Sequence, residues 1–402
     1  GTMTITAQLS AVSGQNISVP FSINGSSTAT DPADYTITAS PISITAGSTT
    51  ADITISIATD TLDEDNETII VDMGSPTNAS QGAITTHTAT IDDDDAEPTV
   101  AFTASSQSSA DESGTITITA ELSAVSGKNV SVPFSINGSS TAIDPSDYTI
   151  TASPISITAG STTADITITI AGDALNESNE TVIIDMGSPT NATQGAITTH
   201  TATITDDDGQ PSVAFTAASQ SSGTETGTMT ITAQLSAASG QDVSLPYTIN
   251  GSSTAADPAD YIITASPITI TAGSTTADIT ITIAGDSLDE DNETVIVDMG
   301  SPTNATQGAV TTHTATIDDD DAEPTIAFTA ASQSSGTETG TMTITAQLSA
   351  LSGKNVSVPF SINGSSTAAD PADYTITASP ISITAGSTTA DITITIAGDT
   401  LD

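Results

Sequence analysis

The stretch "ADITITI" at residues 164–170 carries an apolar side chain at every second position. Ala164, Ile166, Ile168 and Ile170 therefore share one face of an extended segment, and polar side chains occupy the other face. Strict alternation with β-branched residues is typical of a strand that is buried on one side. The stretch predicts a β-strand that packs against an apolar core.

Other stretches of the same kind lie on both sides of it. They include "TMTITAQL" at residues 2–9, "VSVPFSI" at residues 130–136 and "ETVIVDM" at residues 293–299. In "VSVPFSI" the alternation places Val130, Val132, Phe134 and Ile136 on one face. Short polar stretches such as "SGKN", "DPADY" and "TAGSTT" separate these segments and have the composition of turns. We expect an all-β fold of antiparallel, Ig-like β-sandwiches without helices.

The sequence repeats with a period of 113 residues. "GTMTITAQLSA" begins at Gly1, Gly227 and Gly340, and "GTITITAELSA" begins at Gly114. Units of this length are whole domains in series, and acidic runs such as "IDDDDAEPTV" separate them. The expected domains are 1–95, 96–208, 209–321 and 322–402. The first lacks an opening strand and the last lacks its final two strands, so we expect a segment of a longer array. A neighbouring molecule that supplies the missing strands is the alternative.

The charge balance excludes several classes of partner. The net charge is −47, from 49 acidic residues against only Lys128 and Lys354. Such a chain repels nucleic acid and anionic lipid, so its expected partners are cations or a cationic surface. The absence of cysteine excludes disulfides and thiolate metal sites. No apolar run is long enough to predict a membrane-spanning helix. The 36% of hydrophobic residues and their regular alternation argue against disorder.

One acidic stretch returns in each copy. In "AGDSLDEDNETV" at residues 284–295, Asp286, Glu290 and Glu293 follow a strand at relative positions 0, 4 and 7. The residues between these three vary, since Asp289 corresponds to Asn176 in the preceding copy. The same spacing recurs elsewhere: Asp60, Glu64 and Glu67; Asp173, Glu177 and Glu180; and, for the first position alone, Asp399.

Three further acidic positions recur among the repeats, and loops that join alternate strand ends would bring them to the same pole of a sandwich. They are the glutamates Glu112, Glu225 and Glu338 before a strand; the "DY" aspartates Asp34, Asp147, Asp260 and Asp373; and the terminal aspartates Asp92, Asp93 and Asp94, Asp206, Asp207 and Asp208, and Asp318, Asp319 and Asp320.

Electrostatics then favours a bound cation at that pole. Two carboxylates about 5 Å apart repel by roughly 3 kcal/mol at an effective dielectric constant near 20. The summed repulsion of several such pairs approaches the whole free energy of unfolding of a domain, which is about 5–15 kcal/mol. Calcium takes six to eight oxygen ligands in flexible geometry and is favoured over magnesium, which demands a stricter octahedron. The alternative is that the acidic runs are solvated linkers that serve only solubility.

The combination of these motifs resembles the Calx-beta domain of sodium–calcium exchangers, an integrin subunit and bacterial surface proteins. The third repeat has the "DY" step in "ADY" (259–261), the strand pair in "ITAGSTTADITITIAGD" (270–286), the acidic loop in "EDNETV" (290–295) and the terminal "DDDD". Members of the family often have a second aspartate before the first loop aspartate, where this chain has Gly285, Gly172 and Thr59. The resemblance implies these calcium ligands: Glu225, Asp260, Asp286, Glu290, Glu293, Asp318, Asp319 and Asp320.

We found no pattern typical of an enzyme. His87, His200 and His313 are one repeated strand residue in "TTHTATI". Tyr148 and Tyr261, which follow the "DY" aspartate, are expected to pack in the core. No nucleophile elbow, phosphate loop or Cys/His zinc pattern occurs. We expect a non-catalytic protein.

The expected function is structural: a calcium-stiffened stalk or filament that is secreted or on the cell surface. Its expected partners are calcium ions, the neighbouring repeats and copies of itself in a fibre. One alternative is an adhesin whose repeats bind a partner directly. The other is a calcium-sensing module of a larger protein.

Overall fold

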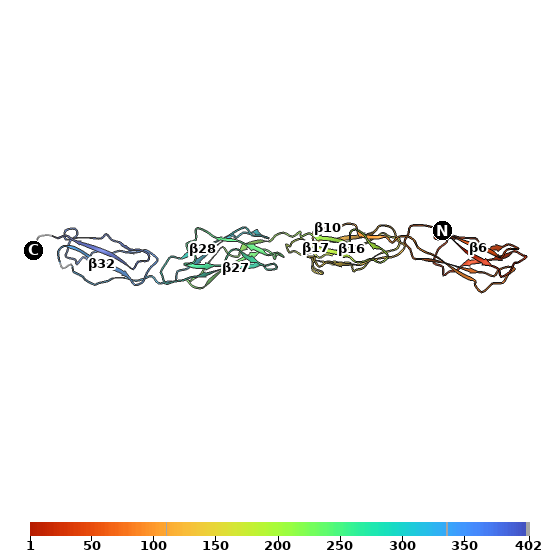
Figure 1. Ribbon diagram of the computed structural model, residues 1–402. Helices are drawn as coiled ribbons and strands as arrows, with labels where there is room; N and C mark the ends of the chain where they lie inside the picture. Colours follow the sequence, from red (N-terminus) through yellow and green to blue (C-terminus); the bar gives the residue numbers. More distant parts are fainter. Residues whose placement is uncertain (110, 335–336, 399–402) are drawn as a thin grey trace. The chain divides into compact units, whose positions relative to one another are not determined.

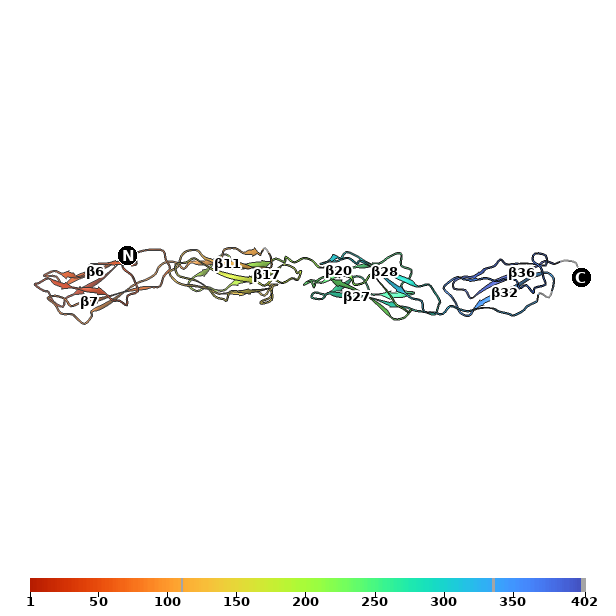
Figure 2. The ribbon, with the colours of Figure 1, turned by 180° about the vertical axis from the view of Figure 1, so that it is seen from behind.

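A computed structural model describes residues 1–109, 111–334 and 337–398. All regular elements within these residues are β-strands, as Figures 1 and 2 show from opposite sides, so the prediction of an all-β fold is confirmed. The chain forms two compact units. The first contains Gly1–Asp173 and Asn179–Asp207, and the second contains Ala174–Ser178 and Asp208–Asp402.

The repeat at residues 96–208 shows the full set of strands, and most of it lies in the first unit. Its strands are β9 (Thr99–Phe102), β10 (Ser106–Ser108), β11 (Thr115–Leu122), β12 (Val130–Val132), β13 (Phe134–Ile136), β14 (Tyr148–Ile150), β15 (Ile155–Ile157), β16 (Thr163–Ile170), β17 (Glu180–Met186), β18 (Thr193–Gln194) and β19 (Thr199–Ile204).

These strands form two main sheets and one small sheet. One sheet has the order β14-β16-β11-β9-β18, the other has the order β10-β19-β17-β13, and β12 pairs with β15 alone. The long central pairs are antiparallel, with Ile118 opposite Ile166 and Val182 opposite Ala202. The short edge pairs β9–β18 and β10–β19 are parallel. The sandwich is therefore antiparallel except at two edges.

The core of this repeat lies between the two main sheets. Ile118 and Ile168 from one sheet and Val182 and Ile184 from the other belong to one buried cluster. The alternation in "ADITITI" thus points its isoleucines inward, as predicted. The prediction for "VSVPFSI" is wrong in part: Pro133 separates β12 from β13, the two strands belong to different sheets, and Ile136 is exposed. A proline has no N–H group to continue one ladder through both strands.

The repeat at residues 209–321 belongs to the second unit and has the same sheet orders. Tyr261 is buried in its core, as Tyr148 is in the previous repeat, so core packing of both tyrosines is confirmed. The strands are β20 (Ser212–Phe215), β21 (Ser219–Ser221), β22 (Thr228–Leu235), β23 (Val243–Leu245), β24 (Tyr247–Ile249), β25 (Tyr261–Ile263), β26 (Ile268–Ile270), β27 (Thr276–Ile283), β28 (Glu293–Met299), β29 (Thr306–Gln307) and β30 (Thr312–Ile317).

The repeated histidine is a buried strand residue in these two repeats. His313 on β30 is 2% exposed, its ring packs edge-on against Phe215 with centroids 6.3 Å apart, and its Nδ1 lies 2.7 Å from the Ala217 carbonyl oxygen. His200 makes the equivalent contacts. These contacts support the expected structural role of the repeated histidine.

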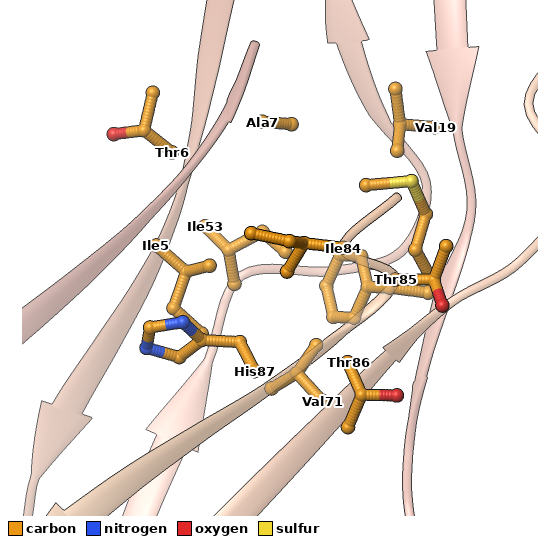
Figure 3. Close-up of a pocket in the computed structure, with 12 residues that line it drawn as sticks. Ile5, Thr6, Ala7, Val19, Ile53, Val71, Ile84, Thr85, Thr86 and His87 are labelled. Carbon is orange, nitrogen blue, oxygen red and sulfur yellow. The ribbon is translucent and has the colours of Figure 1, made fainter. Parts of the chain in front are cut away.

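The repeat at residues 1–95 has a cavity where the two full repeats have their first strands. The cavity of about 110 Å³ is lined by Ile5, Ile53, Val71 and Ile84, among others (Figure 3). Ile84 is 80% exposed, and His87 is also exposed. No described strand of this repeat corresponds to β9 or β10. Its strands are β1 (Thr2–Gln8), β2 (Ile17–Val19), β3 (Phe21–Ile23), β4 (Tyr35–Ile37), β5 (Ile42–Ile44), β6 (Thr50–Ile57), β7 (Glu67–Met73) and β8 (Thr86–Ile91).

The fourth repeat forms one main sheet in the order β31-β32-β36-β34 and a separate β33–β35 pair. Phe328 on β31 is 54% exposed, whereas the equivalent Phe215 is buried. Its strands are β31 (Ile326–Phe328), β32 (Gly340–Leu348), β33 (Val356–Val358), β34 (Tyr374–Ile376), β35 (Ile381–Ile383) and β36 (Thr389–Ile396). A search of the described residues found no helix with the length and apolar character to cross a membrane.

Candidate metal centre

The acid loop of the third repeat, residues 284–292, connects β27 to β28 and carries two of the predicted ligands. Asp286 accepts a hydrogen bond of 2.7 Å from the N–H of Leu288 through Oδ1. This bond between a side chain and the backbone two residues further on is a common way for aspartate to fix a turn. Glu293, the third predicted ligand of the 0/4/7 pattern, is the first residue of β28.

Three acids meet at this end of the sandwich. Glu225, Asp286 and Asp321 each offer one carboxylate oxygen, and the three oxygens lie within 4.8 Å of one another. Glu225 and Asp321 are half-buried and Asp286 is exposed. The Oδ2 atom of Asp321 is buried and has no hydrogen-bond partner among the residues that the structure describes. A buried carboxylate oxygen without a partner is costly, so this atom indicates a missing positive ligand.

Gly285 and Gly172 stand where the family pattern has a second loop aspartate, and neither position has space for a side chain. A Cβ atom at Gly285 would lie 2.1 Å from the carbonyl oxygen of Glu225, and one at Gly172 would lie 2.2 Å from the carbonyl oxygen of Glu112. No side chain fits at that distance. The backbone that carries Glu225 therefore occupies the space where the family pattern would place a side chain.

A second group of acids lies beside the first. Asp260 accepts a hydrogen bond of 2.6 Å from Ala256 N–H. Burial, followed by the Asp260 carboxylate, raises the pKa of Glu293 to about 7. Burial and the charges of Asp319 and Asp321 raise the pKa of Glu225 to about 6. The pKa of Glu290 is also raised, mainly by burial. Burial and, after it, the crowding of negative charges both favour the neutral form of these carboxyls.

The terminal aspartates of this repeat have different surroundings. Asp319 accepts a bond of 3.1 Å from Glu290 N–H, and Asp320 accepts one of 3.2 Å from Glu225 N–H. These two aspartates therefore tie the candidate ligands together through the backbone.

Asp318 points to a neighbouring strand and anchors the end of β30. Its carboxylate accepts hydrogen bonds from Ser221, from Gly223 N–H at 3.0 Å and from Asn292 Nδ2 at 2.8 Å. Thr205, at the same position one repeat earlier, donates from its hydroxyl to the Ser109 carbonyl oxygen at 3.0 Å. A threonine can replace the aspartate there because both serve as anchors.

The first repeat gathers its predicted ligands around a cavity of about 100 Å³. Burial and the charges of neighbouring aspartates raise the pKa of Glu64 and of Glu67. Asp95, the last residue of the run, also has a raised pKa, chiefly from desolvation and from Asp94. The acidic residues that line this cavity are Asp34, Asp60, Glu64, Asp65, Glu67, Asp92, Asp93, Asp94 and Asp95.

The predicted ligands of the second repeat belong to both units: Glu177 and Asp208 to the second, and the others to the first. Glu112 N–H donates to Asp207 at 3.3 Å, and Asp206 N–H donates to the Asn179 side chain at 3.2 Å. Asp147 accepts a bond of 2.6 Å from Ile143 N–H. Asp173 and Glu180 lie at the two ends of the loop that joins β16 to β17.

In the fourth repeat, Asp373 accepts a bond of 2.7 Å from Ala369 N–H, and Glu338 is exposed. Asp399 lies outside the described residues.

The sequence reasoning missed two positions. Asp321 belongs to the three-acid group, and its equivalent Asp95 lines the cavity of the first repeat, yet neither was predicted as a ligand. The predicted Asp208 is the equivalent residue of the second repeat, so internal alignment of the runs could have found both. Asp289, interpreted from the sequence as a variable loop position, is buried, and so is the equivalent Asp63.

The donor set fits a hard divalent cation. Glu225, Asp286 and Asp321 offer only carboxylate oxygens, which suit calcium or magnesium and do not suit metals that prefer nitrogen or sulfur. A bound dication would supply a partner for the buried Asp321 oxygen and would remove the repulsion that raises the neighbouring pKa values.

Comparisons with known proteins identify the family of the chain. The family model of the Calx-beta domain matches residues 1–95, 92–208, 206–321 and 318–402, which together cover the chain. No curated protein matches it.

Solved structures with some likeness include two of Calx proteins. The CBD12 structure from CALX1.2 has 17% identity and a TM-score of 0.27, and the alignment covers 54% of this chain and 98% of that chain. The Calx CBD2 domain has 16% identity and a TM-score of 0.25, with 28% and 91% covered. Likenesses at such TM-scores add nothing to the family match.

Proposed function

This chain belongs to the Calx-beta domain family, and on that premise we propose that its repeats bind calcium and form part of an extracellular, calcium-stiffened stalk or surface filament. The observation that carries the proposal is the three-acid group of Glu225, Asp286 and Asp321. Its oxygens converge within 4.8 Å, and one buried oxygen of Asp321 has no hydrogen-bond partner among the described residues. A cation at this place would satisfy that oxygen.

Calcium is the preferred ion because of the ligands and their setting. The carboxylates come from loops and strand ends rather than from one rigid element, and calcium accepts such flexible geometry. Magnesium demands near-ideal octahedral geometry and keeps several waters. The raised pKa values of Glu225 and Glu293 support the same proposal, since a cation would offset the negative charges of the neighbouring carboxylates that contribute to them.

Stiffening follows from where the acid loops lie. Within the first unit, Asp63 of the first repeat accepts a hydrogen bond of 2.9 Å from Gly127 N–H of the second repeat. Asp63 lies next to Glu64, one of the candidate ligands of the first repeat. An ion that fixes this loop would also fix the attachment of the following repeat. The proposed partners are therefore calcium, the neighbouring repeats and further copies of the chain in a filament.

An extracellular location is proposed because exposed sites of this kind are suited to binding calcium with modest affinity. Calcium-binding modules outside cells work with dissociation constants of about 10⁻⁴–10⁻³ M. Repeats of nearly identical sequence suit a spacer, since each copy presents the same surface.

The test is a calcium titration of the whole chain, with magnesium as the control ion. Calcium at 1 mM is about ten times a dissociation constant of 10⁻⁴ M, and it stabilises the fold by about 1.4 kcal/mol. For a domain of this size, that free energy raises the melting temperature by about 5 °C. X-ray scattering with and without chelator should show a longer particle in calcium. If neither the melting temperature nor the maximum dimension changes at millimolar calcium, the proposal is wrong.

A further inference from the structure

Successive repeats meet through one recurring backbone contact. Isolated parallel bridges pair Asp63 with Ser126, Asn176 with Ser239, and Asp289 with Ser352. We call the first residue of each pair the loop-side residue, and the tripeptides 126–128, 239–241 and 352–354 the joint turns. In each joint turn the glycine N–H donates to the carbonyl oxygen of the loop-side residue, at distances of 2.9, 3.1 and 2.9 Å. The serines of all three turns are buried.

The glycine of each joint turn packs closely against a glutamate of the acid loop. A Cβ atom at Gly127 would lie 2.7 Å from Cγ of Glu64, and one at Gly353 would lie 2.6 Å from Cγ of Glu290. The same approach occurs between Gly240 and Glu177. The joint turn therefore packs directly against the acid loop, and no space for a side chain is left between them. A small movement of the acid loop will therefore also move the joint turn.

Buried ion pairs complete two of these contacts. Lys128 Nζ lies 2.8 Å from Asp63 Oδ1, and the Ser126 hydroxyl donates to Asp63 Oδ2 at 3.2 Å. Only 3% of the Asp63 side chain is exposed, although 19% of the Lys128 side chain is. Lys354 and Asp289 form the equivalent pair at 2.9 Å. These two lysines are the only basic residues in the sequence apart from histidine.

At the joint turn 239–241 both partners change together. Gln241 stands in place of the lysine, and the buried Asn176 stands in place of the aspartate. The backbone contact is retained. Each side of the joint therefore has one charge fewer, whereas the backbone pairing is the same. The mixed combinations would be costly: a buried aspartate facing glutamine keeps an unpaired charge, and a lysine facing asparagine loses its counter-ion.

We propose that the loop-side residue and the last residue of the joint turn form a matched pair that selects which repeat docks onto which. An aspartate accepts a lysine turn through an ion pair. Where the turn carries Gln241, the loop-side Asn176 is neutral and its Nδ2 donates to the Asp208 carbonyl oxygen at 3.1 Å. The acid loop of one repeat is thus a docking surface, and its partner is the joint turn of the next repeat with the complementary charge. Lys354 also lies 3.9 Å from the candidate ligand Asp319, so the pairing is tested without calcium.

The experiment is hydrogen–deuterium exchange of the whole chain in calcium-free buffer, read by mass spectrometry. The variants are Asp63→Asn, Lys128→Gln and both together, which recreates the natural combination of Asn176 and Gln241. The peptide at residues 124–134 contains the Gly127 amide that bonds to Asp63. The peptide at residues 350–360 reports on the unchanged Asp289–Lys354 joint, and its slightly different sequence distinguishes it by mass.

Each single variant should speed exchange of the 124–134 amides by at least about tenfold, because each leaves one buried or half-buried group unmatched. The double variant should return to within about threefold of the wild type, because the two changes compensate. Exchange in the 350–360 peptide should stay the same in all three. Unchanged exchange in the single variants would overturn the proposal, and so would a double variant that exchanges as fast as the faster single one.

Discussion

At the scale of single residues, Gly285 shows how tightly the candidate metal centre is built. Its Cα faces the carbonyl oxygen of Glu225, and a Cβ atom would lie 2.1 Å from that oxygen. A contact with backbone cannot be relieved by turning a side chain. Substitution must therefore move the segment that carries Glu225, a member of the three-acid group.

We expect Gly285→Ala to destabilise the third repeat by about 1–3 kcal/mol, the usual cost of an added methyl group in a packed site. Gly251→Ala is the matched control, since an added Cβ there has nothing within 4 Å. Native-state hydrogen exchange of third-repeat peptides measures both. Equal effects of the two substitutions would show that the close approach at Gly285 does not exist in solution.

Asp321→Asn tests the residue that the sequence reasoning missed. The variant keeps the size of the side chain and removes the charge, so we expect the calcium affinity of the third repeat to fall about tenfold or more. Isothermal titration calorimetry of the whole chain should show fewer tight sites than in the wild type. Asp278→Asn is the control, because Asp278 lies on β27, is exposed and bonds to Thr232. A titration unchanged by Asp321→Asn would exclude Asp321 as a ligand.

At the scale of strands, the segment from β20 to β21 determines whether the repeated histidine is buried. Ala217, between these strands, lies 2.7 Å from His313 Nδ1 with its carbonyl oxygen, and Phe215 packs on the ring. In the first repeat, where no described strand corresponds to β20, His87 is exposed. The same six residues, "THTATI", thus have two different surroundings.

This difference predicts unequal effects of one substitution. His313→Ala should destabilise its repeat by about 2–4 kcal/mol, from the cavity left by the ring and the lost hydrogen bond. His87→Ala should change stability by less than about 0.5 kcal/mol, as exposed substitutions usually do. Hydrogen exchange of β30 and β8 peptides can measure the two. Similar losses at both positions would mean that β8 is covered in solution.

The sequence predicted strands well because alternation follows directly from the two faces of a sheet. "ADITITI" gave inward-facing isoleucines, and they are buried in β16 and β27. It could not show that β12 and β13 belong to different sheets, or that β10 pairs in parallel with β19, because pairing depends on residues almost 100 positions apart.

The candidate site was predicted in outline only. Spacing identified which acids recur, but it could not tell Asp318, whose carboxylate anchors a strand end, from Asp321, which joins the three-acid group. Both lie in one run of four identical residues, and only the path of the backbone separates their roles. The buried Asp289 was overlooked for a related reason. Its contact with the following repeat cannot be inferred from the sequence of one repeat.

At the scale of the whole molecule, the net charge of −47 should weaken the fold when no divalent cation is present. Monovalent salt screens such repulsion, with a Debye length of about 30 Å at 0.01 M and about 3 Å at 1 M. We expect the melting temperature of the chelated chain to rise steadily with sodium chloride. In millimolar calcium the rise should be smaller, because bound ions have already reduced the charge. Calorimetry over a salt series would reveal either trend, and a fall in melting temperature with salt would contradict this account.

The position of the two lysines at the joints has one more consequence. Trypsin cuts after lysine and arginine, so this chain offers it only the bonds that follow Lys128 and Lys354. Both side chains are held in ion pairs with buried aspartates of the preceding repeat. A protease must open a joint before it can cut, and the fragments it releases would show which joint had opened. Limited digestion of the unlabelled protein therefore measures how often the two joints that contain Lys128 and Lys354 open.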